Sequence, residues 1–238
     1  MTAVEHLKVK IFADGADKAG ILDMYAKPYI KGFTTNPTLM RKAGLTDYAA
    51  FCKDILTLIP DRHFSFEVFS DDFDEMERHA REISSWGECV YVKIPITNTR
   101  REPSYDLLRR LAGQGIKVNV TALMTLDQVR KATDALGGGP AACISVFAGR
   151  VADTGRDPVP MMRDAVEIMS AHPNLELIWA SPRELLNIFQ ADSIGCHIIT
   201  VTNDVLKKLS LVGKDLDDYS LDTVKMFYQD AQAAGYKI

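Results

Sequence analysis

The segment VYVKIP, residues 90–95, has the pattern of a buried β-strand that carries one charged residue. Every second residue from Val90 is apolar, which is the period of two that a strand with one buried face requires. Lys93 therefore lies on the opposite face, together with Tyr91 and Pro95. Because an unpaired ammonium group is costly to bury, this strand indicates a lysine with a partner or a chemical role.

Outward from this strand, the chain repeats the alternation of a short β-type run and an amphipathic helical pattern. The other runs rich in β-branched or aromatic residues are 8–13, 32–35, 63–69, 117–121, 142–147, 175–180 and 197–201. The helical patterns lie at 17–25, 46–59, 72–86, 104–113, 126–136, 158–169, 182–190 and 203–211. Eight such units predict an α/β fold, the (β/α)8 TIM barrel.

A single domain over residues 1–238 is the better interpretation, because no linker or change of composition divides the chain. Residues 215–238 are expected to form a helical extension beyond the eight units. The alternative is an open doubly wound sheet, which normally has a glycine-rich phosphate loop after its first strand. Residues 14–17 read DGAD and lack that motif, so the barrel is favoured.

The composition is that of an ordinary globular protein, with 47% hydrophobic and 25% charged residues. A net charge of -4 leaves no basic excess for a phosphate backbone, so no nucleic-acid partner is expected. No apolar run is long enough for a membrane span and residues 1–12 lack a signal-peptide pattern, so a cytoplasmic protein with no membrane partner is expected. The cysteines and histidines show no ligand spacing, and neither a metal nor another cofactor is predicted.

The period of two also predicts which side chains face the barrel interior with Lys93. They are Phe12, Asp14, Ser65, Glu67, Asn119, Thr121, Ser145 and Phe147. Carboxylates, an amide and hydroxyls would thus surround one amine, which indicates a nucleophilic lysine. A lysine that only pairs with Asp14 or Glu67 explains the strand pattern equally well.

Five ordered segments resemble the signatures of the transaldolase family, which includes the short fructose-6-phosphate aldolases. They are GFTTNPTL at 32–39, YVKIP at 91–95, VNVTALMT at 118–125, SVFAGRVADTG at 145–155 and WASPRE at 179–184. The resemblance implies a barrel enzyme that needs no cofactor. It also implies that Lys93 forms a Schiff base with a ketose carbonyl, which makes catalysis the favoured role of this lysine.

The resemblance implies roles for the residues around Lys93. Asp14 is similar to the carboxylate that exchanges a proton with the substrate hydroxyl at the cleaved bond, while Glu67 and Thr121 are similar to the pair that holds a catalytic water. The positions that resemble substrate-binding residues are Thr34, Asn36, Asn119, Ser145, Phe147, Arg150, Ser181 and Arg183. The two arginines of this set, with the two serines, correspond to the site of a terminal phosphate. The planar N–H donors of a guanidinium group match the oxygens of a phosphate.

These roles imply a class I transaldolase that transfers a dihydroxyacetone unit from a ketose phosphate, such as fructose 6-phosphate, to an aldehyde acceptor. Glu67 and Phe147 favour transfer, because the similar aldolases have Gln and Tyr at these positions and a Tyr hydroxyl could protonate the enamine. The alternatives are an aldolase that releases free dihydroxyacetone, an enzyme for a sulfonated ketose, and a non-catalytic barrel that binds sugar phosphates.

Three positions depart from the family pattern. Gly15 follows Asp14 where a small hydroxyl residue is usual, so extra space beside this carboxylate is expected. Pro182 stands where an aromatic is common, and Trp179 is large for the end of a strand. These two residues leave both phosphate and sulfonate open as the terminal anion.

A homo-oligomer is expected, as a dimer, a pentamer or a decamer. Short enzymes that resemble this chain pack their C-terminal helix across neighbouring subunits in rings of five or ten, and larger relatives form dimers. The apolar residues Met226, Phe227 and Tyr228 of the C-terminal extension need to be covered, which makes a monomer the least favoured state.

Overall fold

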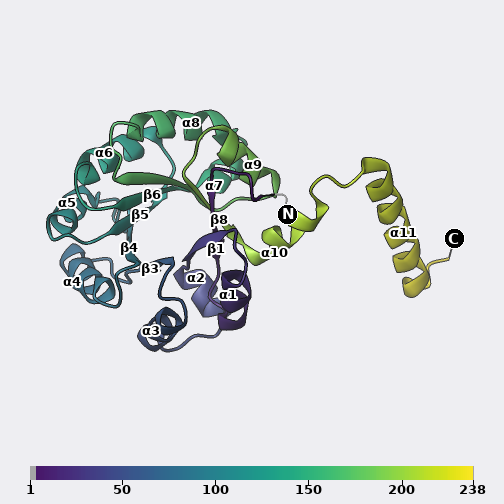
Figure 1. Cartoon of the computed structure of the whole chain (residues 1–238), viewed down its shortest axis with the longest axis horizontal. Helices are drawn as coiled ribbons and strands as arrows, with labels where there is room; N and C mark the ends of the chain where they lie inside the picture. Colours follow the sequence, from purple (N-terminus) through teal and green to yellow (C-terminus); the bar gives the residue numbers. More distant parts are fainter. Residues whose placement is uncertain (1–3, 238) are drawn as a thin grey trace.

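Residues 4–237 are described in the computed structural model, and within them eight parallel strands close into a barrel in chain order (Figure 1). The strands are β1 (Lys10–Asp14), β2 (Ile30–Thr34), β3 (His63–Glu67), β4 (Val90–Pro95), β5 (Val118–Leu123), β6 (Ala142–Val146), β7 (Leu175–Trp179) and β8 (Ile198–Thr202). The pairing of β8 with β1 closes the sheet. The TIM barrel predicted from the eight alternating units is therefore confirmed.

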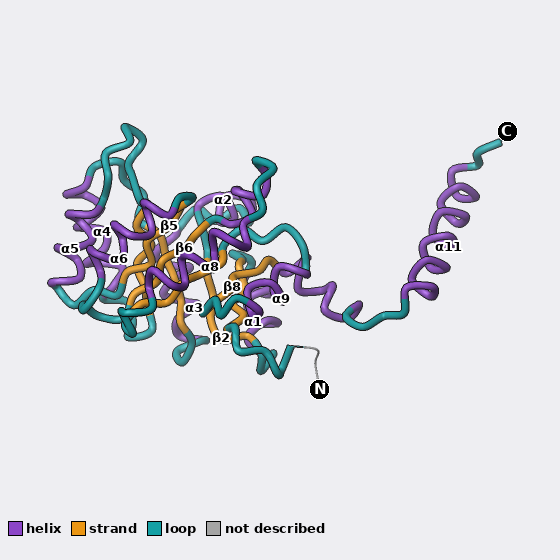
Figure 2. Tube along the Cα trace, turned by 90° about the horizontal axis from the view of Figure 1, so that it is seen from above, coloured by secondary structure: helices purple, strands orange, loops and turns teal. Residues whose placement is uncertain are grey.

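Helices surround this barrel and cover the outer face of the strands, apart from the last helix of the chain (Figures 1 and 2). They are α1 (Lys18–Tyr25), α2 (Pro37–Lys42), α3 (Tyr48–Leu58), α4 (Phe73–Ser84), α5 (Tyr105–Gly113), α6 (Leu126–Leu136), α7 (Ala148–Asp153), α8 (Pro158–Met169), α9 (Leu186–Ser193), α10 (Asn203–Leu206), the 3-10 helix η1 (Lys207–Leu211) and α11 (Leu216–Ala234). The short helices α2 and α7 were not predicted, and the helical pattern at 203–211 is divided between α10 and η1. Among residues 4–237, no helix has both the length and the apolar character needed to cross a bilayer.

Helix α9 begins at Leu186, four residues later than the helical pattern that starts at Pro182. The side-chain oxygen of Asn187 accepts hydrogen bonds from the backbone N–H groups of Arg183 and Glu184, at 2.8 and 3.1 Å. These bonds fold the chain into a turn before the helix. The Asn side chain takes backbone N–H groups that would otherwise belong to a longer helix. The turn holds Arg183 at the mouth of the barrel.

The two faces of β4 divide as the period of two predicts. Val90, Val92 and Ile94 pack in the apolar layer between strands and helices. Phe12 and Ile178 belong to a separate apolar cluster, which is formed by side chains inside the barrel. Lys93, between Val92 and Ile94, is thereby directed inward.

Aromatic rings fill the part of the barrel interior nearer the N-terminal ends of the strands. The ring of Phe12 packs edge-on against the ring of His63, with 4.7 Å between the ring centres. Tyr91 stacks on the His63 ring, with 3.8 Å between the centres. Gly32 faces Phe12 on the neighbouring strand, where an added Cβ would lie 2.6 Å from the ring. Only glycine leaves room for the Phe12 ring, so this part of the interior is packed. The space for a ligand lies nearer the C-terminal ends of the strands.

Helix α11 stands apart from the barrel at the end of the chain segment that follows η1 (Figures 1 and 2). None of its residues, all of which the structure describes, is buried. Large apolar side chains are exposed along it, including Leu216, Val224, Phe227 and Tyr228. The predicted helical extension is thus present, with an apolar surface that this chain does not cover.

Candidate active site

A cavity of about 700 Å³ lies at the C-terminal ends of the strands. The polar and charged residues that line it are Asp14, Thr34, Asn36, Thr38, Glu67, Lys93, Thr121, Ser145, Arg150, Ser181, Arg183, Thr200, Thr202 and Asp204, with Phe147 beside them. Every candidate residue from the sequence is in this set except Asn119. The active sites of TIM barrels lie at this end, so the cavity is the candidate active site.

Lys93 reaches the cavity from the middle of β4 with most of its surface buried. Its ammonium nitrogen lies 3.0 Å from Oε2 of Glu67 and donates to the carbonyl oxygen of Thr35 at 2.9 Å. Strand register explains the ion pair, because Glu67 on β3 lies directly beside Lys93 on β4. The charge is therefore paired, and the carboxylate that pairs with it is placed to take its proton.

Asp14 ends β1 with a carboxyl group that is removed from water. Burial raises the pKa of this carboxyl, and the charge of Lys93 and a hydrogen bond from Thr34 only partly oppose that rise. The Thr34 hydroxyl donates to Asp14 Oδ1 at 2.8 Å. A carboxyl group whose pKa is raised toward neutrality exchanges protons with a substrate more readily than an ordinary aspartate.

Thr200 is a polar residue of this cavity that the sequence reasoning missed. Its hydroxyl lies 2.5 Å from that of Thr34, so a Thr200–Thr34–Asp14 chain of hydrogen bonds crosses from β8 over β2 to β1. The signal was available, because the period of two on β8 places Thr200 on the same face as Ile198, whose side chain lies inside the barrel.

Thr121 lies on β5 with a fully buried hydroxyl that has no hydrogen-bond partner among the described residues. Buried hydroxyls are normally satisfied by protein or water, so this group fits a bound water or a substrate oxygen. The next residue, Ala122, has φ of 67°, in the left-handed region that costs a residue with a Cβ. Backbone strain of this kind concentrates at functional sites.

Asn119 lies below the cavity and is completely buried. Its side-chain oxygen accepts from the Ser145 hydroxyl at 2.7 Å, and its NH2 group donates to the Ser65 hydroxyl at 3.0 Å. The sequence reasoning placed Asn119 correctly on the inward face. It could not show that both ends of the amide are engaged within the protein, because the partners come from strands β3 and β6.

Asn36 lines the cavity at the start of α2, where its side-chain oxygen accepts from the backbone N–H of Leu39 at 3.0 Å. Together with Pro37 at the first helical position, this cap explains why a short helix forms here. The cap occupies one acceptor position of the side-chain oxygen, and the NH2 group of Asn36 makes no hydrogen bond to the described residues.

The two arginines of the sequence prediction lie on the same side of the cavity. Arg150 on α7 lies over the Phe147 ring at 5.4 Å. Arg183 donates through Nε to Oδ1 of Asp153 at 2.9 Å and through Nη2 to the other oxygen of that carboxylate. One fork of Arg183 is thus already occupied, and an anion meets only its remaining N–H groups.

The backbone between β7 and α9 is tightly packed against α7. Ser181 has φ of 59°, and its carbonyl oxygen would lie 1.6 Å from a Cβ added at Gly149. Only glycine allows α7 and this loop to meet, which brings both arginines to one rim. Trp179 is completely buried in the outer apolar layer and does not line the cavity, so its size does not narrow the space beside the two arginines.

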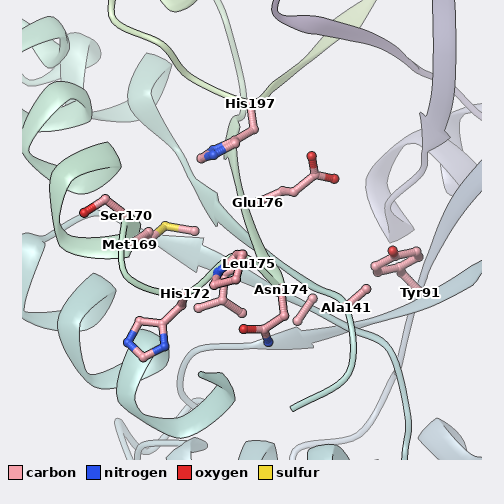
Figure 3. Close-up of a pocket in the computed structure, with 11 residues that line it drawn as sticks. Tyr91, Ala141, Met169, Ser170, His172, Asn174, Leu175, Glu176 and His197 are labelled. Carbon is pink, nitrogen blue, oxygen red and sulfur yellow. The ribbon is translucent and has the colours of Figure 1, made fainter. Parts of the chain in front are cut away.

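A smaller cavity of about 250 Å³ lies at the opposite end of the barrel (Figure 3). Its labelled polar side chains point in different directions, with His172 and His197 facing away from Glu176 (Figure 3). Glu176 pairs with Lys10 at 2.5 Å. Within the part of the chain that the structure describes, no group of three or more His, Cys, Asp or Glu side chains is placed to hold a metal ion.

Solved structures with low sequence identity share the barrel fold. Dihydrodipicolinate synthase from Rhodopseudomonas palustris superposes with a TM-score of 0.54 at 16% identity, covering 90% of this chain and 79% of that protein. The protein described as KGPDC from Streptococcus mutans superposes with a TM-score of 0.57 at 10% identity, covering 85% and 91%. At such identities the similarity shows the fold alone.

Sequence relatives are more informative. A probable transaldolase from Thermoanaerobacter sp. (strain X514) is 35% identical over 231 residues, which cover 97% of this chain and 100% of the relative. A probable transaldolase from Dehalococcoides mccartyi (strain ATCC BAA-2266 / KCTC 15142 / 195) is 34% identical over 202 residues, covering 84% and 90%. Residues 11–238 match the family described as Transaldolase/Fructose-6-phosphate aldolase. The chain therefore belongs to the transaldolase/fructose-6-phosphate aldolase family.

Proposed function

We propose that this protein is a class I transaldolase that forms a Schiff base through Lys93. The observation that carries the proposal is one amine inside a closed barrel, with its charge paired to Glu67 and with the buried carboxyl of Asp14 in the same cavity. This arrangement supplies the nucleophile and two proton carriers of an imine reaction. The names of the sequence relatives support the same activity.

The reaction begins when Glu67 takes a proton from Lys93 and the free amine adds to the C2 carbonyl of a ketose. Proton transfer through a water near Glu67 and the unpaired Thr121 hydroxyl releases the C2 oxygen as water and leaves an iminium. The positive nitrogen then receives the electron pair of the C3–C4 bond while Asp14 takes the C4 hydroxyl proton. An aldehyde leaves, and a three-carbon enamine remains on Lys93.

The fate of this enamine separates transfer from free aldol cleavage. Phe147 lines the cavity with a ring that carries no hydroxyl, so it supplies no proton to the enamine carbon. The enamine then adds to a second aldehyde, and hydrolysis of the new iminium releases the product ketose. The second candidate is an aldolase that releases dihydroxyacetone, which requires another proton donor for the enamine.

The terminal group of the donor is proposed to be an anion bound at the rim by Arg150 and Arg183. Both lie at one side of the cavity, and Arg150 has no salt bridge within residues 4–237. A ketose phosphate is the favoured donor because two guanidinium groups match phosphate oxygens. A sulfonated ketose has the same kind of terminal oxygens, and direct competition between the two donors distinguishes them.

Borohydride trapping tests the proposal directly. Protein is reduced in the presence of fructose 6-phosphate, and the expected result is a stable mass increase on a peptide that contains Lys93. Lys93→Met is the control and forms no adduct. Absence of an adduct with any ketose would support the non-catalytic sugar-phosphate-binding barrel, whereas dihydroxyacetone release as fast as transfer would support the aldolase.

We further propose that the whole chain acts as one catalytic domain whose extension, α11, packs against another copy. The exposed apolar residues along α11 are the observation that supports this assembly. Mass measurement in solution is expected to show a homo-oligomer, and Phe227→Glu with Tyr228→Glu is expected to reduce it to smaller species. A monomeric parent protein contradicts the proposal.

A further inference from the structure

A line of polar side chains runs through the packed interior of the barrel and ends in the active-site cavity. His63 Nε2 lies 2.7 Å from the Ser65 hydroxyl, and Asn119 donates to that same hydroxyl at 3.0 Å. Ser145 completes the line by donating to the Asn119 oxygen at 2.7 Å. Ser65, Asn119 and Ser145 are almost completely buried, and of the four residues only Ser145 lines the cavity.

The amide of Asn119 sets the direction of two hydrogen bonds in this line, and the direction of the third depends on the tautomer of His63. The Ser65 hydroxyl accepts a hydrogen bond from Asn119, so its own O–H is free to donate to His63 Nε2. His63 accepts it only if Nε2 is unprotonated. Burial, together with the charges of Lys10 and Lys117, lowers the pKa of His63 to about 3, so the ring is neutral at physiological pH, and it accepts this hydrogen bond in the tautomer that carries its proton on Nδ1.

The consequence reaches the cavity through Ser145. The Ser145 hydroxyl donates its single proton to the Asn119 oxygen, away from the cavity. Its oxygen can therefore only accept a hydrogen bond from a ligand. It then accepts a hydrogen bond from a substrate hydroxyl and disfavours a group with no proton to give, so in this role Ser145 serves a hydroxyl and not the terminal phosphate that the family resemblance implies for it. Without His63, Ser65 could reverse, the amide of Asn119 could turn over, and the hydroxyl of Ser145 would lose its fixed direction.

We propose that His63 is a positioning residue that orients Ser145, through Ser65 and Asn119, as an acceptor for a hydroxyl of the ketose donor. His63 itself lies below the cavity and touches no substrate. This inference rests on the proposed function, and it assigns a task to a histidine that the Schiff-base steps do not use. It also explains why polar groups cross an interior otherwise packed with rings.

A double-mutant cycle tests the role of His63. His63→Phe keeps a planar ring against Tyr91 but removes the acceptor, and His63→Gln keeps an acceptor in its side-chain oxygen. The kcat/KM for transfer from fructose 6-phosphate is measured for each variant with Ser145 present and with Ser145→Ala. Ser65→Ala, which removes the middle link, provides a second break if His63→Phe does not fold.

The expected loss for His63→Phe and for Ser65→Ala is roughly three- to tenfold, the size of one ordinary hydrogen bond, and it appears mainly in KM. His63→Gln restores most of it, and His63→Phe has almost no further effect once Ser145 is alanine. Tyr91→Phe, which leaves the stacked ring in place, serves as the matched control with parent activity.

Equal losses with and without Ser145, or no loss from either break of the line, overturn the role of His63. These outcomes are separate from failure of the proposed function. A parent protein that forms no borohydride adduct at Lys93 overturns both, while an adduct in the parent together with additive losses overturns only the positioning role.

Discussion

The two ends of the barrel interior contain the same kinds of side chain but use them differently. At the C-terminal end, Lys93, Glu67 and Asp14 meet around a cavity of about 700 Å³. Toward the N-terminal end, rings fill the interior, and the charged pair of Lys10 and Glu176 lies in part at the surface. The charges proposed to react are held beside the larger cavity, whereas packed rings fill most of the interior toward the other end.

Lys93→Met is the sharpest test of this difference. We expect transfer activity to fall by about 10⁴-fold or more, because the nucleophile is lost. Folding is expected to be retained, because Met keeps the volume of the side chain and the Glu67 carboxylate, which loses its partner, lines the open cavity where water can reach it. Steady-state rates and circular dichroism measure the two effects. Activity within tenfold of the parent would contradict the covalent role and leave a binding role.

Asp14→Asn is expected to lower kcat by about 10²- to 10⁴-fold, because an amide cannot take the proton of the C4 hydroxyl. The free energy of unfolding is expected to rise in the variant at neutral pH, although its activity falls. Burial raises the pKa of Asp14 above its ordinary 3.8, so its native-state contribution is present at low pH and is lost as pH rises through the raised pKa. Asparagine does not ionise, so the variant does not lose stability at this position as the pH rises.

Urea unfolding across an acid-to-neutral pH series checks this sign. The stability of Asp14→Asn relative to the parent should increase as pH rises. A constant difference across the series would show that Asp14 is not strained by its burial. Asp164→Asn, a substitution at an exposed carboxylate of α8, is the control for a general effect of removing one negative charge.

Gly32→Ala tests the packed end. An added Cβ would lie 2.6 Å from the Phe12 ring, so we expect a loss of about 1–3 kcal/mol in the free energy of unfolding. Activity per folded molecule is expected to stay near that of the parent. Gly15→Ala is the matched control, since nothing lies within 4 Å of its added Cβ and no stability change of this size is expected. Equal stability of both variants would contradict the packed interior.

Asp153→Asn is expected to have the smallest effect. The substitution weakens the ion pair that occupies one fork of Arg183, and this pair is about half exposed. The KM for fructose 6-phosphate is therefore expected to fall by about two- to fivefold, with no change for unphosphorylated fructose. Competition kinetics with both donors measures it. An equal change for both sugars would place the effect outside the anion site.

The strands and their inward faces could be predicted because they depend on local alternation. The same rule applied to β8 would have found Thr200, and applied to β7 it would have placed Trp179 outside the barrel. Helix starts were less predictable. Asn187 delays α9 through side-chain bonds to the backbone, which compete with a helical pattern that looks continuous in the sequence.

By itself, the sequence determined the barrel, the inward direction of Lys93 and most of the residues at the cavity, because a period of two is a property of each strand alone. The tertiary structure decided which inward side chains become partners. It paired Lys93 with Glu67, joined Asn119 on β5 to residues of β3 and β6 across the barrel interior, and engaged Arg183 with the carboxylate of Asp153. These choices depend on the register of neighbouring strands in a closed sheet and on how loops meet at its rim, and no single segment contains that information.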